Sequence, residues 1–311
     1  MSHDHLDFQV DQLENRLLLA GDVSVSVRGE NVSIVGDNAA NSVRVFVSDG
    51  TVHVSTYAEL VDTGLAEIKN LRITLKDSGD GEVIALANAG GTTGGDTFEI
   101  SNDVVVTNRT SINMGSGQNY VDFGGLHNRA RIRGGRDADH VVLNGGFATR
   151  VAAVSVGGGN DHVQLEVAGY IDAIESEGPL FDYLSEVAEQ VDVDDLTSAL
   201  RLVPKIRGNL GGGDDLFDIT VDGTVVTDEA ILEGINELGE DLGFEFDTID
   251  EAVAQVDALA DDFGIKLPNA VRLSGGGGTD TLLPGSAASI LGLIGKVNKF
   301  EAFEAPENWE S

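Results

Sequence analysis

The sequence predicts a mainly β protein: a single parallel β-helix, or solenoid, of about eight coils with two α-helical insertions. A short unit recurs along the chain, in which an apolar alternating strand leads into a glycine turn that ends in Asp or Asn, and then into a second alternating strand. Such a unit cannot bury its own apolar face and has to stack on copies of itself. The turn residues are Asp96, Asn119, Asp139, Asp161, Asp215 and Asp280.

The spacing of these turn residues predicts the length of a coil. The first three intervals are 23, 20 and 22 residues, and each is expected to be one coil. The last two, of 54 and 65 residues, are expected to hold one coil plus an insertion. In the insertions, at about residues 171–204 and 227–267, the apolar period changes from that of a strand to that of a helix. Thr248 and Glu251 have the spacing of a capping box. We expect two acidic helical hairpins.

The two ends of such a solenoid expose unpaired sheet edges, which need a cap. Residues 1–20 are expected to form a separate apolar segment ahead of a solenoid domain over residues 21–311. Its apolar residues recur at helical spacing, so it could cap the first coil or anchor a neighbouring subunit. These residues are Leu6, Val10, Leu13 and Leu17. The apolar run Ile290–Ile294, with Val297, is expected to close the other end.

The composition restricts the partners. Asp and Glu outnumber Lys and Arg by 53 to 19, which gives a net charge of −34 and opposes binding to nucleic acid or to an anionic membrane. The excess favours calcium binding or, equally, solubility in a salty medium. There is no cysteine, so disulfides and thiol chemistry are absent. No apolar run has the length of a membrane-spanning helix, so we expect no membrane insertion.

The glycine turns resemble the calcium-binding nonapeptide of RTX proteins, most clearly at Gly157–Val163 and Gly211–Phe217. The resemblance implies Ca²⁺ as a cofactor, bound between successive turns by turn carbonyls and Asp carboxylates. The side chains that would bind it are Asn160, Asp161, Asp214, Asp215, Asp139 and Asp280. The alternative is that these turns bind no metal. In that case glycine adopts the positive φ that the turn requires, and the Asp or Asn side chain hydrogen-bonds the turn backbone.

Three arginines share one face of a predicted strand. Arg129, Arg131 and Arg133 alternate with Ala130 and Ile132, which enter the core. On so acidic a chain we expect this patch to meet carboxylates, either in neighbouring coils or on the acidic helices of another subunit. The second arrangement would give a head-to-tail contact that can propagate.

Two histidines directly follow turn residues. His140 follows Asp139 and His162 follows Asp161, so adjacent coils should stack the two rings. We expect surface histidines rather than a metal ladder, because two ring positions without further ligands make a poor site.

The search for catalytic motifs yields little, and we expect no enzymatic activity. The sequence has no cysteine nucleophile, no Gly-x-Ser-x-Gly elbow, no phosphate-binding loop and no His-Glu-x-x-His. Adjacent acidic pairs are frequent, but neighbours on a strand point to opposite faces. Carboxylates from different coils could still converge as a glycosidase pair.

The run Leu13–Asp22 resembles the N-terminal Leu-Glu-Pro-Arg-x-Leu-Leu segment of large surface or secreted proteins of planctomycete bacteria, with Asn15 in place of the proline. The resemblance implies an extracellular or cell-surface location, with the segment acting in export or sorting, and implies no enzymatic activity. The alternative is that Leu13–Leu19 is an apolar helical turn.

These features favour a non-enzymatic, extracellular structural protein that assembles with copies of itself into a surface fibre or coat. A second hypothesis is an adhesin or a module that binds polysaccharide. It needs an aromatic platform, for which the candidates are Tyr120, Tyr170, Phe181 and Tyr183. A third is a β-helix polysaccharide lyase or hydrolase, which needs the three arginines and several carboxylates in one groove.

Overall fold

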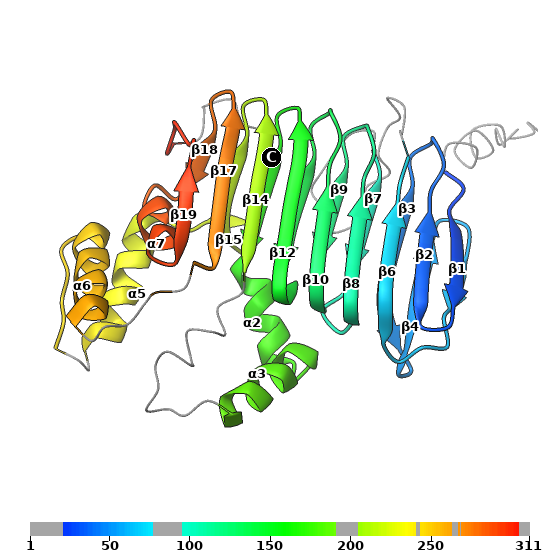
Figure 1. Cartoon of the computed structure of the whole chain (residues 1–311), viewed down its shortest axis with the longest axis horizontal. Coiled ribbons are helices and arrows are strands. Elements are labelled where there is room, and N and C mark those ends of the chain that lie inside the picture. Colours follow the sequence, from blue (N-terminus) through cyan, green and yellow to red (C-terminus); the bar gives the residue numbers. More distant parts are fainter. Residues whose placement is uncertain are drawn as a thin grey trace, which may run out of the picture.

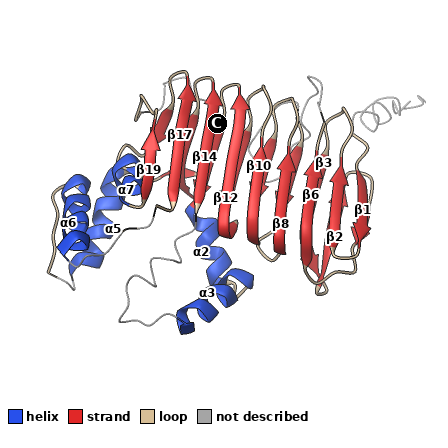
Figure 2. Cartoon of the chain, viewed as in Figure 1, coloured by secondary structure: helices blue, strands red, loops and turns tan. Residues whose placement is uncertain are grey.

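The structure is a computed structural model that describes residues 21–76, 95–190, 205–240, 243–262, 267 and 269–304. Its strands form two large mixed sheets that lie face to face, and helices lie at their margins (Figures 1 and 2). The N-terminal segment with Leu6, Val10, Leu13 and Leu17 lies outside the described residues. So does the end of the first predicted insertion, residues 191–204.

Sheet 1 has nine strands in the order β1-β2-β6-β8-β10-β12-β14-β17-β19, and it is the nearer sheet in Figure 1. All of its neighbours are parallel except β1 and β2. The strands are β1 (Ser24–Arg28), β2 (Asn31–Val35), β6 (Ile68–Thr74), β8 (Val105–Asn113), β10 (Leu126–Arg133), β12 (Phe147–Gly158), β14 (Ile206–Gly212), β17 (Val271–Gly277) and β19 (Gly295–Asn298).

Sheet 2 has ten strands in the order β16-β15-β13-β11-β9-β7-β3-β4-β5, with β18 paired to β15. The pairs β3–β4, β4–β5 and β15–β16 are antiparallel, and the others are parallel. The strands are β3 (Ser42–Ser48), β4 (Thr51–Thr56), β5 (Leu60–Asp62), β7 (Thr97–Ile100), β9 (Tyr120–Phe123), β11 (His140–Asn144), β13 (His162–Glu166), β15 (Leu216–Val221), β16 (Thr224–Val225) and β18 (Thr281–Leu283).

The prediction of a single parallel β-helix, or β-solenoid, is therefore wrong, because the strands belong to two mixed sheets. Sharp reversals of the chain produce the antiparallel strand pairs that a parallel β-helix lacks. Asp49 and Gly50 both have positive φ, 52° and 76°, and join β3 to β4 as a hairpin. Asp222 and Gly223, with φ of 49° and 73°, do the same for β15 and β16. Two residues with positive φ make the hairpin turn whose twist matches antiparallel strands.

The core lies between the sheets and follows from the alternation in each strand. Ile112, Ile132 and Val154 point inward from sheet 1, and Val121 and Val141 point inward from sheet 2; all are fully or almost fully buried. Successive side chains of a strand point to opposite faces, so the intervening residues form the outer face of each sheet. That alternation places the polar residues of the strands on these outer faces.

The helices occupy the two predicted insertions and the C-terminal end. They are α2 (Val167–Glu175), α3 (Pro179–Gln190), α5 (Asp228–Glu240), α6 (Ile249–Asp262) and α7 (Ala287–Leu293). The predicted capping residue Thr248 accepts the backbone N–H of Glu251 at 3.2 Å, and the Glu251 carboxylate accepts the N–H of Asp247 at 3.2 Å. Leu291, Ile294 and Val297 pack against the core at the end of the sheets, with Val297 inside β19.

Candidate functional site

The turn residues form a ladder that crosses the molecule. In each step a side-chain oxygen accepts the backbone N–H of the preceding ladder residue, at 2.7–3.2 Å. At the last step the Glu301 carboxylate accepts the N–H of Asp280 at 3.1 Å. At most 3% of any ladder residue is exposed. The ladder residues are Asn41, Asp96, Asn119, Asp139, Asp161, Asp215 and Asp280.

Burial raises the pKa values of these carboxyl groups. The pKa of Asp161 rises to about 8 through burial, aided by the charges of Asp139 and Asp215 on either side. Burial raises the pKa of Asp96 and of Asp215 to about 7, and that of Asp139 to about 6. The second oxygens of Asp96, Asp161, Asp215 and Asp280 are buried without a hydrogen-bond partner among the described residues. The ladder therefore favours neutral side chains, and two of its positions are Asn.

The six predicted calcium-binding residues all take part in such contacts. Asp139, Asp161, Asp215 and Asp280 belong to the buried ladder. Asn160 and Asp214 make a second, outer series, in which Asn160 accepts the N–H of Asp214 at 3.0 Å and Asp214 accepts that of Thr279 at 2.8 Å. No group of three or more His, Asp or Glu side chains suited to a metal is found in the described parts of the chain. Calcium binding at the glycine turns therefore stays a prediction.

The outer face of sheet 2 carries a polar cluster that the sequence did not reveal. The rings of His140 and His162 stack with centroids 4.3 Å apart, as expected, but His162 is only 9% exposed. His162 Nε2 lies 3.0 Å from the Asp218 carboxylate. Burial, followed by the charge of His162, lowers the pKa of His140 to about 3. His162 is therefore buried on this sheet face, whereas His140 is partly exposed.

Glu166 joins this cluster to helix α2. Its carboxylate accepts the backbone N–H groups of Ala168, Asp222 and Gly223 at 2.9–3.1 Å and the Thr220 hydroxyl at 2.9 Å. Burial acts to raise the pKa of Glu166, but these hydrogen bonds outweigh it and lower the pKa. The Glu166 carboxylate therefore connects the start of α2 to the β15–β16 hairpin by hydrogen bonds.

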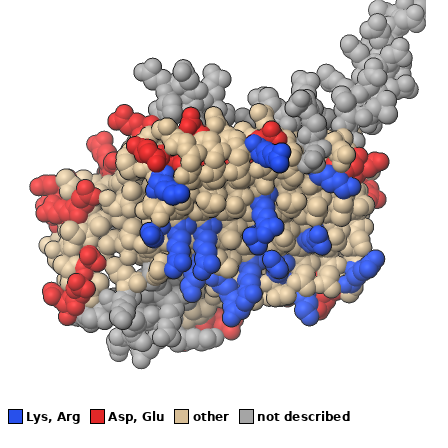
Figure 3. Space-filling view, turned by 45° about the horizontal axis from the view of Figure 1, so that its top comes forward, with Lys and Arg blue, Asp and Glu red and all other residues tan. Residues whose placement is uncertain are grey.

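The outer face of sheet 1 is strongly basic. The nine described strands contain no Asp or Glu, although the chain has 53. They contain 11 of the 19 Lys and Arg residues, and all 11 are exposed (Figure 3). These are Arg28, Lys69, Arg72, Arg109, Arg129, Arg131, Arg133, Arg150, Arg207, Arg272 and Lys296. We call this surface the basic face.

Sheet 2 has the opposite character. Its strands carry five acidic residues and one basic residue: Asp62, Glu99, Asp122, Glu166, Asp218 and Arg44. Arg44 is paired with Glu99 at 2.8 Å, whereas no cation of the basic face forms an ion pair within the described residues. The segregation gives one side of an acidic protein positive charge that has no ion-pair partner among the described residues.

The predicted arginine patch lies in the middle of this surface. Arg129, Arg131 and Arg133 point outward from β10, and Ala130 and Ile132 enter the core, as their alternation indicated. The neighbouring strands β8 and β12 offer them no carboxylate. The described residues therefore do not assemble the groove of arginines and carboxylates on which the lyase or hydrolase hypothesis depends.

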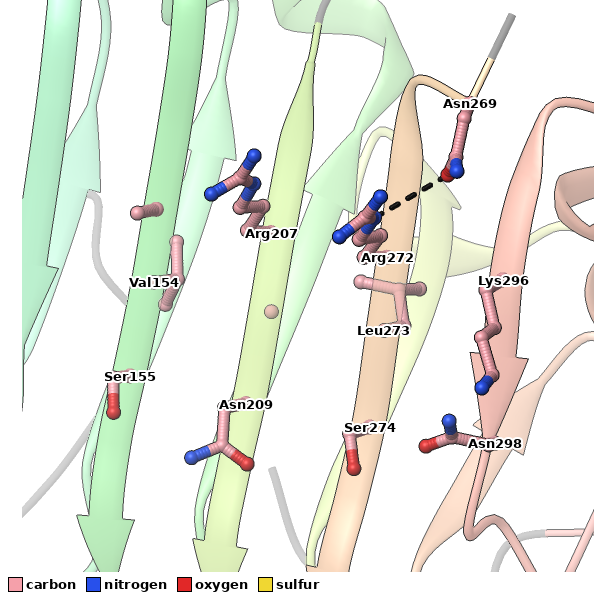
Figure 4. A pocket seen from close by; sticks show the side chains of 12 residues that line it. Val154, Ser155, Arg207, Asn209, Asn269, Arg272, Leu273, Ser274, Lys296 and Asn298 are labelled. Atoms are coloured by element: carbon pink, nitrogen blue, oxygen red, sulfur yellow. Dashed lines mark hydrogen bonds between the residues drawn. The ribbon is translucent and has the colours of Figure 1, made fainter.

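A groove of about 560 Å³ runs over β12, β14, β17 and β19 on the basic face (Figure 4). Its charged residues are Arg207, Arg272 and Lys296, and its small residues include Ala153 and Gly208. Arg272 Nε donates a hydrogen bond to Asn269 Oδ1 at 3.3 Å, which orients the guanidinium along the groove. Guanidinium and ammonium groups can bind carboxylate, sulfate or phosphate.

The four candidate aromatic residues do not form a shared platform. Tyr120 lies on sheet 2 and packs edge-on against His140. Tyr170 and Tyr183 belong to a small core with Phe147 beneath α2 and α3, and the Tyr170 hydroxyl donates to the Gly146 carbonyl at 3.0 Å. Phe181 on α3 is 38% exposed. Stacking of sugar rings on these side chains is therefore not supported.

None of the described helices combines the length and the apolar character needed to cross a membrane. Comparison of the chain with protein-family models, with curated proteins and with solved structures gave no match.

Proposed function

We propose that this protein is a non-enzymatic, extracellular or cell-surface module that binds a polyanion on its basic face. The single observation that carries the proposal is the charge segregation: sheet 1 has 11 cations and no carboxylate in its described strands, on a chain of net charge −34. Random placement of so few cations would leave most of them beside acidic residues. Exposed cations that form no ion pair within the described part of the chain are available for an external anion.

The net negative charge does not prevent this binding. Charges further apart than a Debye length, about 8 Å at physiological ionic strength, are largely screened. Nine strands at ~4.8 Å spacing make the basic face roughly 38 Å wide, so a ligand at its centre responds mainly to the local cations. The acidic margins in Figure 3 would repel a wide anionic ligand. They therefore favour a narrow, linear ligand that lies within the basic face.

The test is binding of the full chain to dextran sulfate, with uncharged dextran as the matched polymer. We expect binding to dextran sulfate alone, weakening steeply between about 50 and 200 mM salt because counterions are released. Arg207→Gln should weaken binding, whereas Arg44→Gln, which removes one guanidinium from sheet 2, should not. Equal binding to both polymers, or no binding to either, would overturn the proposal.

A second candidate function is self-assembly, in which the acidic helices of one copy dock on the basic face of another. The observation that favours it is the composition of α5 and α6, which carry acidic residues along their length and no Lys or Arg. Such a contact joins different surfaces and can continue from copy to copy into a fibre.

Sedimentation of the full chain distinguishes the two candidates. Self-assembly predicts large species at low salt that dissociate at high salt, in Ca²⁺ or in EGTA alike, and that Arg207→Gln reduces. A monomer at every concentration and salt would leave only the polyanion proposal. A chain shortened to begin at Gly21 would show whether the segment with Leu6 and Leu17 contributes to assembly.

A further inference from the structure

We infer that the polyanion is a linear acidic polysaccharide that lies in the groove across the strands, with one anionic sugar for each strand. This inference rests on the proposed function and makes its ligand specific. It comes from the register of β12, β14, β17 and β19, which aligns the outward side chains of the groove into two rows (Figure 4).

The first row is cationic. Arg207, Arg272 and Lys296 are direct partners in the parallel register of β14, β17 and β19. All three are exposed, and they repeat at the ~4.8 Å spacing of neighbouring strands. On the other side of Arg207 the row passes Ala153 and reaches Arg131.

The second row is neutral and polar. Ser155, Asn209, Ser274 and Asn298 are partners in the same register, two residues further along each strand. Two residues of a strand span about 6.6–6.8 Å. Each of β14, β17 and β19 therefore presents one cation and one amide or hydroxyl group, at the same separation, on the same face.

A ligand that fits this pattern repeats an anion together with a neutral hydrogen-bonding group. An acidic polysaccharide does so, because each sugar carries a carboxylate or sulfate as well as hydroxyl groups. Guanidinium groups match the anion, and Asn and Ser side chains can both donate to and accept from hydroxyls. Ala153 lies beside Arg207 in the first row, and its small side chain leaves room for a sugar ring at that end of the groove.

Nucleic acid fits the groove less well. Binding of single strands relies on aromatic side chains on which bases stack, and no Phe, Tyr or Trp points outward among the described groove residues.

The experiment compares polygalacturonate with inorganic polyphosphate, which is a polyanion without hydroxyl groups. The variant Asn209→Ala with Ser274→Ala removes two hydrogen-bonding side chains and no charge. It should weaken binding of polygalacturonate by roughly tenfold or more and leave polyphosphate binding unchanged. Arg207→Gln with Arg272→Gln should weaken both. Unchanged thermal unfolding of each variant shows that the fold is intact.

Two further measurements sharpen the result. Affinity for galacturonate oligomers should rise with each unit up to at least three, one for each cation of β14, β17 and β19, and methyl-esterified polygalacturonate should not bind. If polyphosphate binds but the Asn209 and Ser274 variant binds polygalacturonate normally, the polysaccharide inference fails and the polyanion proposal stands. Tighter binding of oligo-dT than of polygalacturonate would also overturn the inference. If no polyanion binds, both fail.

Discussion

The carboxylate of Asp215 accepts the backbone N–H of Asp161 at 2.8 Å, although neither residue is exposed to solvent. Two acidic side chains one strand apart therefore share a dry environment. The same contact recurs at Asn119, whose uncharged amide oxygen accepts the backbone N–H of Asp96 at 3.0 Å. The backbone needs an acceptor at each step of the ladder, but it does not need a charge.

We predict that the protein is more stable in mild acid than in mild alkali. The pKa of Asp161 is about 8 and that of Asp215 about 7 when folded, against about 3.9 in an unfolded chain. Because these pKa values are raised, their contribution to stability is complete below about pH 4 and is lost as the pH rises through 7 and 8. The unfolding temperature should be higher at pH 5 than at pH 9. Each kcal/mol of stability corresponds to a shift of about 2–4 °C.

A pair of substitutions isolates the ladder from general charge effects. Asp161→Asn keeps the acceptor for the Asp139 N–H and removes the charge, so it should raise the unfolding temperature at pH 9 and flatten the pH profile. Asp137→Asn makes the same change at an exposed position of a turn and should alter the profile little. If the unfolding temperature of Asp161→Asn falls with pH as steeply as that of the unsubstituted protein, the ladder is not the source of the pH dependence.

Calcium binding, if the turns bind it, should depend on pH in the opposite sense. Ligand carboxyl groups must be deprotonated before they bind a cation, and the raised pKa values of Asp161 and Asp215 delay this to near pH 8. We therefore expect Ca²⁺ to raise the unfolding temperature relative to EGTA at pH 8.5 and much less at pH 5.5. Mg²⁺ serves as the control cation. No effect of Ca²⁺ at pH 8.5 would contradict the prediction of a calcium cofactor.

Gly213, in one of the glycine turns, should tolerate no side chain. Gly213 has a φ of 134°, and a Cβ there would collide with the carbonyl oxygen of Gly159 in the neighbouring turn. Gly213→Ala should cost about 2 kcal/mol or more of stability. Gly234→Ala, on the helix α5 with open space around it, should instead be neutral or stabilise by up to about 1 kcal/mol. Urea unfolding of the two variants measures both effects, and similar free energies for the two would refute the close stacking of the turns.

The sequence predicted the strands, the turns and the insertions better than their assembly. Alternation placed Ala130 and Ile132 in the core and the arginines outside, because the period of a strand is a local property. The direction of the next strand was not visible. A glycine turn such as Asp222-Gly223 can lead either into a hairpin or onward to the next coil, and its positive φ values decide between them.

The basic face was predictable only in part. Arg129, Arg131 and Arg133 lie on one strand, so the sequence showed a local patch. Arg207 and Arg272, in contrast, are 65 residues apart in the sequence, and Arg272 and Lys296 are 24 apart. Only the parallel register places them side by side. The cluster of His162, Asp218 and Glu166 was missed for the same reason. His162 and Asp218 are 56 residues apart, and Glu166 is 54 residues from Thr220; the pairing of β13 with β15 brings them together.

Glu166 should be essential for stability rather than for binding. Only 8% of it is exposed, and its carboxylate accepts three backbone N–H groups and the Thr220 hydroxyl. Glu166→Gln replaces one acceptor oxygen by an amide that faces these donors, so buried donors lose their partner. We expect a loss of about 2–4 kcal/mol, measured by urea unfolding, with unchanged affinity for dextran sulfate in the folded protein. Glu175→Gln, at an exposed position of α2, is the control. A Glu166→Gln protein that unfolds like the control would show that the hairpin and α2 do not depend on this carboxylate.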